Sequence, residues 1–138
     1  MRTVYATLQK LRDQEKREKS LLYADAERSR IEKEEEVLDG YRRLEEERQV
    51  RAESMGMRVL QDYLNMQRHI EIQQKEKELQ EATIHAEVCR EEMIAAQVES
   101  KVMERVIETL EEKEQKSYKQ QVDRFNDEIA IMGWGRNR

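Results

Sequence analysis

Small and apolar residues recur at alternating steps of three and four along residues 79–110. Since an α-helix turns every 3.6 residues, this spacing gathers them on one face of a helix. A stripe that keeps this period is typical of a coiled coil, in which it packs against another helix. The stripe, called the seam below, consists of Leu79, Ala82, Ala86, Cys89, Met93, Ala96, Ser100, Met103, Ile107 and Leu110.

Apolar residues also line the chain before and after the seam, although less regularly. The N-terminal line is interrupted between Leu11 and Leu21 by RDQEKREKS, so its phase shifts there. We expect it to face the seam with Val4, Leu8, Leu11, Leu22, Ile31, Leu38 and Tyr41. Before the seam lie Val59, Tyr63, Met66 and Ile70; after it, with one slip of phase, lie Tyr118, Val122, Phe125, Ile129 and Met132.

The chain is predicted to reverse direction once, near Gly56, where the charge density drops and Ser54 can cap a following helix. We therefore expect helix one over about 3–52, a turn at about 53–57 and helix two over about 57–132. The glycines at 133 and 135 are expected to stop helix two near Met132, leaving 133–138 as an irregular tail. Gly40 is expected to be tolerated inside helix one, at a cost of about 1 kcal/mol.

The predicted fold is all-α: a single antiparallel two-helix coiled coil, or long α-hairpin, whose second helix is the longer. In a hairpin that reverses near residue 55, the numbers of facing positions sum to about 110. Leu8 and Leu11 would then face Met103 and Ser100, Leu22 would face Val88, Ile31 would face Leu79, and Tyr41 would lie near Ile70.

Two apolar lines have no predicted partner in this hairpin. The residues after Leu110 lie beyond the reach of helix one, and exposed apolar stripes usually mark binding sites for partners. The other line runs beside the seam and consists of Ile84, Val88, Ala95, Val98, Val102 and Val106.

The composition favours this narrow packing over a globular core. Charged residues make up 41% of the chain and aromatics 5%, and there is no proline to break a long helix. The net charge of −5 is spread over interleaved acids and bases, so most charges are expected on solvated helix faces. A single cysteine excludes an intramolecular disulfide, and no apolar run approaches the ~20 residues that span a bilayer. We expect a cytoplasmic protein.

Sequence motifs for enzymatic chemistry are missing. The chain has neither G-x-x-x-x-G-K-[ST] nor G-x-G-x-x-G, which would cradle phosphates. His85 and Cys89 are four residues apart, but a surface histidine beside a small seam residue explains them better than a metal site. On an exposed helix we expect nothing to shift the pKa of carboxylates far or to exclude water, so catalysis is not expected. We predict no enzyme activity, catalytic residue, cofactor or metal.

Four segments resemble the FliJ family of flagellar type III export proteins and the related YscO group of injectisomes. They are VYATLQKLRDQEKREKSLL, VLDGYRRL, VLQDYLNMQRHIEIQ and EEKEQKSYKQQVDRFNDEIA, and the resemblance covers nearly the whole chain. It implies a monomeric stalk and coupling protein, peripheral to the membrane-embedded export apparatus. The implied partners are the hexameric export ATPase, the cytoplasmic domain of the export gate and export chaperones.

The resemblance also implies two contact surfaces. The export gate would be contacted by Leu38, Tyr41, Met66 and Ile70. The ATPase would be contacted by Leu8, Leu11, Tyr118, Val122, Phe125 and Ile129. The family pattern assigns no role to Trp134 or the GWGRNR tail, and the choice between a flagellum and an injectisome stays open.

Two other functions are compatible with parts of the pattern. The first is a structural tether, in which one continuous helix through Gly56 forms a parallel homodimer. The second is an arm that binds nucleic acid through the basic segment 1–20 together with Arg136 and Arg138. The overall acidic charge argues against the second function.

Overall fold

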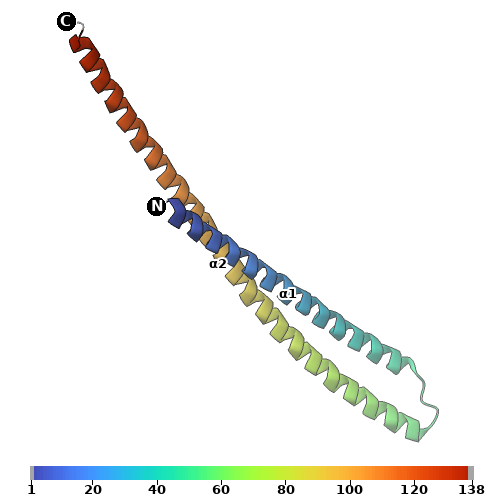
Figure 1. Ribbon diagram of the computed structural model, residues 1–138. Coiled ribbons are helices and arrows are strands. Elements are labelled where there is room, and N and C mark those ends of the chain that lie inside the picture. Colours follow the sequence, from blue (N-terminus) through green and yellow to red (C-terminus); the bar gives the residue numbers. More distant parts are fainter. Residues whose placement is uncertain (1, 137–138) are drawn as a thin grey trace. The chain divides into compact units, whose positions relative to one another are not determined.

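The computed structural model describes the backbone of residues 2–136 and the side chains of residues 4–134. Two helices make up the fold (Figure 1): α1 spans Arg2–Gln49 and α2 spans Met55–Arg136. They contain 48 and 82 residues, and no strand occurs within the described backbone. The predicted all-α fold, a helical hairpin with a longer second arm, is confirmed.

A short connection at residues 50–54 interrupts the helix. Ser54 caps α2, because its Oγ accepts a hydrogen bond of 3.1 Å from the backbone N–H of Met57. Gln61 fixes the other side of the connection by donating to the carbonyl oxygens of Glu47 and Val50, at 3.1 and 2.7 Å. The alternative of one continuous helix is therefore wrong, and Gly56 lies in the first turn of α2 instead of in the connection.

The predicted end of the second helix near Met132 is also wrong, because α2 continues to Arg136. Glycine ends a helix when it adopts the left-handed conformation, and no glycine in the described backbone has a positive φ. Gly133 keeps helical geometry with open space around it. Residues 137–138, and with them the predicted role of Arg138, lie outside the described part of the chain.

The chain divides into two compact units, and each helix contributes to both. Unit 1 consists of residues 1–14 and 97–138, and unit 2 consists of residues 15–96.

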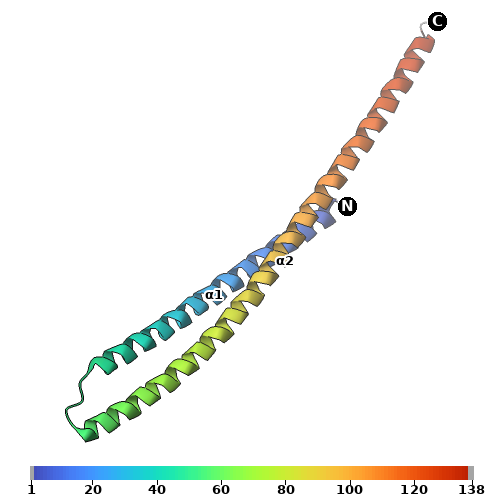
Figure 2. The ribbon, with the colours of Figure 1, turned by 180° about the vertical axis from the view of Figure 1, so that it is seen from behind.

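Unit 2 is an antiparallel hairpin closed by the connection (Figure 2). Ion pairs fix its direction, since Lys19 pairs with Glu92 and Lys33 with Glu78. Close to the connection a Cβ built on Gly40 would lie 3.1 Å from Cγ1 of Ile72, so the two helices approach closely there. The buried apolar side chains of unit 2 are Ala26, Val37, Leu44, Ile72, Ala86, Cys89 and Ala96.

In unit 1 the first turns of α1 lie against residues 97–110 of α2. Ser100 Oγ donates a hydrogen bond of 2.9 Å to Asp13 Oδ1, and Arg12 pairs with Glu99 at 2.6 Å. Further along, a cavity of about 190 Å³ is lined by Tyr5, Ala6, Ile107, Leu110, Glu111 and Glu114. Beyond this point α2 runs on without a second helix beside it (Figure 1).

The face that α1 turns toward α2 differs from the predicted one. All ten seam residues of α2 are buried or half-buried, as expected. The predicted α1 line is exposed instead, at Val4, Leu8, Leu11, Leu22, Ile31, Leu38 and Tyr41. The contacting positions, which also follow steps of three and four, are Tyr5, Gln9, Arg12, Lys16, Lys19, Tyr23, Ala26, Arg30, Lys33, Val37, Gly40, Leu44 and Glu47.

The small size of the seam residues explains why this other face of α1 is turned toward α2. Ala86, Ala96 and Ser100 leave room for long polar side chains, whose apolar stems can pack while their charged ends reach the edge of the interface. Arg12, Lys19 and Lys33 do this and end on glutamates of α2. The residues predicted to lie at the same height along the two helices are close to the observed ones. However, α1 is rotated about its own axis by about one residue position, or ~100°, from the predicted orientation.

Candidate partner-binding surfaces

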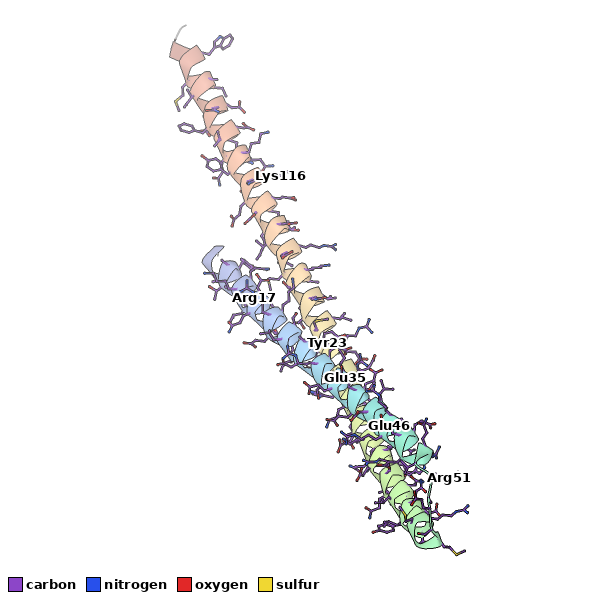
Figure 3. The ribbon with its side chains drawn as sticks, turned by 90° about the vertical axis from the view of Figure 1, so that its right-hand side faces the viewer. Arg17, Tyr23, Glu35, Glu46, Arg51 and Lys116 are labelled. Carbon is purple, nitrogen blue, oxygen red and sulfur yellow. The ribbon has the colours of Figure 1, made fainter. Side chains whose placement is uncertain are left out.

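The last part of α2 is an isolated amphipathic helix. Leu110 is the last half-buried residue, and every described side chain from 111 to 134 is exposed. Figure 3 shows Lys116 on this part of α2, with no second helix facing it. The steps of four and three gather five apolar side chains on one side of the helix. This terminal stripe consists of Tyr118, Val122, Phe125, Ile129 and Met132, all of them exposed.

The terminal stripe is a candidate binding surface because all five of its side chains are exposed. An isolated helix gains little stability in water and depends on packing of its apolar face. Phe125 is 61% exposed, although an aromatic side chain of this size contributes strongly when it is buried in an interface.

The other predicted ATPase-contact residues, Leu8 and Leu11, lie in the first turns of α1 in unit 1. Both are exposed, since Gln9 and Arg12 take the positions toward α2. Tyr5 and Ala6 lie beside Leu110 at the point where the paired part of unit 1 ends. Leu8 and Leu11 therefore lie farther along the paired part, and no contact between them and the terminal stripe is observed.

The predicted gate-contact residues Leu38, Tyr41, Met66 and Ile70 are all exposed in unit 2. Because Gly40 lies against Ile72, Tyr41 is level with the turn that contains Ile70. Met66 precedes Arg68, which pairs with Glu47, and so lies closer to the connection. These four exposed side chains, which are spread along both helices, are called the patch below.

Tyr41 has a polar anchor within this patch, because its hydroxyl donates a hydrogen bond to Glu76 Oε1 on α2. The adjacent carboxylate raises the pKa of Tyr41, since it accepts from the neutral phenol and repels the phenolate. The contact holds the ring across the two helices while leaving its face in water.

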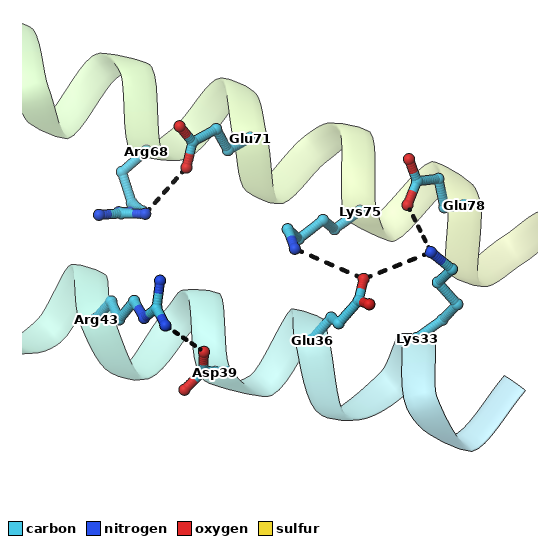
Figure 4. A network of polar contacts seen from close by, with 8 residues as sticks. All are labelled: Lys33, Glu36, Asp39, Arg43, Arg68, Glu71, Lys75 and Glu78. Atoms are coloured by element: carbon cyan, nitrogen blue, oxygen red, sulfur yellow. Dashed lines mark hydrogen bonds and ion pairs between the residues drawn. The ribbon is translucent and has the colours of Figure 1, made fainter. Parts of the chain in front are cut away.

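Charged side chains tie the two helices together around the patch (Figure 4). Glu36 forms ion pairs with Lys33 at 3.5 Å and with Lys75 at 3.6 Å, and Lys33 also pairs with Glu78 at 3.2 Å. Lys33 lowers the pKa of Glu78, chiefly through the hydrogen bond, and Glu78 in turn raises the pKa of Lys33. These half-buried pairs at the edge of the interface fix the register more than they add stability.

One apolar surface was missed at the level of the sequence. Near the connection a cavity of about 240 Å³ is lined by Glu47, Val50, Arg51, Ala52, Met57, Leu60, Gln61, Leu64 and Asn65. The available signal is the dense apolar run from Val59 to Met66, in which Leu60 and Leu64 lie off the predicted line of Val59, Tyr63 and Met66. The structure leaves Val59, Leu60, Tyr63, Leu64 and Met66 exposed.

The second apolar line on α2 is exposed as expected. It consists of Ile84, Val88, Ala95, Val98, Val102 and Val106.

Cys89 Sγ and His85 Nε2 are 3.7 Å apart. Across the described residues, no group of three or more His, Cys, Asp or Glu side chains could hold a metal ion. Neither helix, over the residues that the structure describes, is long and apolar enough to cross a membrane.

These features define a coiled-coil hairpin protein that presents exposed apolar stripes instead of an enclosed site. A family model described as the flagellar FliJ protein matches residues 1–138, the entire chain. The chain therefore belongs to the FliJ family and is a protein of the flagellar export apparatus; the family is an export component and not a known enzyme family. The chain matches no curated protein and no solved structure.

Proposed function

We propose that this chain is a non-enzymatic stalk and coupling protein of flagellar protein export, acting at the cytoplasmic side of the membrane-embedded apparatus. Its terminal stripe, together with Leu8 and Leu11, docks into the hexameric export ATPase. The observation that carries this proposal is the exposure of every described side chain from 111 to 134, five of which form an apolar stripe. Such a stripe gains stability only from an outside partner.

The second proposed contact is with the cytoplasmic domain of the export gate, through Leu38, Tyr41, Met66 and Ile70. Their exposure supports it, as does the anchoring of Tyr41 to Glu76, which restrains the ring before binding. The family resemblance also implies binding of export chaperones, for which we assign no residues.

The ATPase contact is tested by adding the protein to the purified hexameric ATPase and measuring ATP hydrolysis. We expect stimulation by the unaltered chain. Phe125→Asp should weaken binding at least about tenfold, because it places a charge in the centre of the apolar contact. The variant should keep its helicity, since Phe125 is 61% exposed and contributes little packing to unit 1.

Gln120→Asp is the matched control. Gln120 is exposed on the opposite side of the same helical turns, and the substitution adds the same negative charge. It should leave stimulation unchanged. Equal stimulation by Phe125→Asp and the unaltered chain would reject the assigned ATPase surface.

The gate contact is tested separately by titrating the isolated cytoplasmic domain of the gate. We expect Leu38→Asp to reduce affinity at least about tenfold. Ala24→Asp is its control, because Ala24 is exposed four helical turns away on the same side of α1. Equal affinity of both variants would remove Leu38 from the interface.

A further inference from the structure

The first turns of α1 carry two neighbouring faces that could pack on the same partner. The inner face, Tyr5, Gln9 and Arg12, is turned toward α2 and half-buried. The outer face, Val4, Leu8 and Leu11, is exposed. The two faces have identical steps of four and three, and the outer face precedes the inner one by a single residue. A roll of ~100° about the helix axis would exchange them.

The α2 surface beneath them could accept either face. It consists of Ser100, Met103, Ile107 and Leu110, which are apolar except for one hydroxyl. The observed arrangement leaves Val4 61%, Leu8 37% and Leu11 56% exposed. It also buries the Oε1 atom of Gln9 without a hydrogen-bond partner. Apolar side chains thus remain in water while a polar atom is buried unsatisfied, which is an unfavourable combination.

Polar contacts hold the inner face in place. Ser100 is 1% exposed, and its hydroxyl donates to Asp13 Oδ1 at 2.9 Å. The same carboxylate oxygen accepts from Gln9 Nε2 at 3.2 Å. Arg12 Nη1 donates to Glu99 Oε2 at 2.6 Å, at the edge of the interface. Ser100 is therefore the buried group that favours the inner face over the outer one.

We propose that residues 4–13 of α1 switch between two rolled states on α2, with the Ser100–Asp13 hydrogen bond selecting the observed one and a one-residue π-bulge in the turn after Asp13 taking up the roll, so that the rest of α1 stays packed. In the second state Val4, Leu8 and Leu11 are buried against the same α2 surface, and Asp13 turns away from Ser100. The Ser100 hydroxyl then bonds to a backbone carbonyl of its own helix, as serine commonly does in helices.

The switch controls whether Leu8 and Leu11 are accessible to a partner. They are exposed in the observed state and covered in the second one. Their use by the ATPase rests on the proposed function, whereas the two rolled states rest only on the packing within unit 1. The two ideas can therefore fail independently.

Disulfide trapping of the full-length chain in a Cys89→Ala background tests the switch without any partner. Tyr5→Cys with Ile107→Cys reports the observed state, because Tyr5 and Ile107 line one cavity. Val4→Cys with Ile107→Cys reports the second state, in which Val4 takes the place of Tyr5. We expect both pairs to oxidise, the Tyr5 pair faster.

Ser100→Ala should then shift the balance, raising the rate of the Val4 pair relative to the Tyr5 pair by about threefold or more. Thr109→Ala is the control, since the Thr109 hydroxyl donates to the Arg105 carbonyl oxygen of its own helix at 2.8 Å, and it should leave the ratio unchanged. Circular dichroism checks that all variants stay helical. A Val4 pair that does not oxidise, or a ratio unaffected by Ser100→Ala, would overturn the proposal.

Discussion

The part of unit 2 nearest the connection and the terminal segment 111–134 use similar residues in opposite ways. Near the connection Val37, Leu44 and Ile72 are buried, and Gly40 lets the helices approach closely. In the terminal segment Val122, Phe125 and Ile129 follow an equally regular spacing but remain in water. One region thus buries its apolar residues within the chain, whereas the other leaves them exposed.

This difference shows that a helical period specifies a face but not what covers it. The terminal stripe is uncovered because the paired part of unit 1 ends near Leu110, and the described side chains from 111 to 134 are all exposed. Stability is therefore expected to depend on the first region, and binding on the second. Identical substitutions in the two regions can separate these roles.

The largest difference in stability between the two regions is expected when an isoleucine in each is replaced by alanine. Ile72 is 2% exposed, so Ile72→Ala should lower the free energy of unfolding by about 2–5 kcal/mol, through lost burial and the cavity left beside Gly40. Ile129→Ala removes the same atoms from an exposed site and should change the free energy of unfolding by less than about 0.5 kcal/mol. Urea unfolding followed by circular dichroism measures both. Comparable losses would show that the terminal stripe is packed in the free protein.

Much of this contrast could be predicted from the sequence. The ten positions from Leu79 to Leu110 keep their period without a break, and all of them face inward. The same spacing indicated that the residues after Leu110 would have no partner. Ser54 was identified as a cap because a serine before an apolar helical pattern can satisfy a free N–H, and its Oγ accepts from Met57.

The inward face of α1 could not be predicted in the same way. Apolar content favoured Val4, Leu8 and Leu11, but each has a polar or aromatic neighbour at the next position with the same spacing. The outcome depends on contacts across the interface, such as Ser100 with Asp13 and Arg12 with Glu99. Pairings between residues far apart in the chain do not appear in the periodicity of either helix.

A smaller difference is expected for serine. Ser54→Ala removes the cap of α2 and should destabilise the hairpin by about 1 kcal/mol. Ser117 lies in the middle of the isolated segment, where alanine is the better helix former, so Ser117→Ala should stabilise that segment by up to about 0.5 kcal/mol. The loss of stability in Ser54→Ala is measured as a lower unfolding midpoint. The gain in Ser117→Ala is measured as a stronger helical ellipticity. An unfolding midpoint that Ser54→Ala leaves unchanged or raises would mean that Ser54 does not act as a cap.

The smallest effect concerns the ion pairs between the helices of unit 2. Lys33 holds the pKa of Glu78 below its ordinary value of 4.5, so the charged carboxylate is favoured in the folded state. The stabilisation is complete above that ordinary value and is lost as the pH falls through the lower folded pKa. Glu78→Gln should therefore lower the melting temperature slightly at neutral pH, and the difference from the unaltered chain should vanish in acid. Glu128→Gln, in the terminal segment, corrects for the loss of one negative charge. A difference that persists unchanged in strong acid would show that Glu78 stabilises unit 2 by packing and not by its charge.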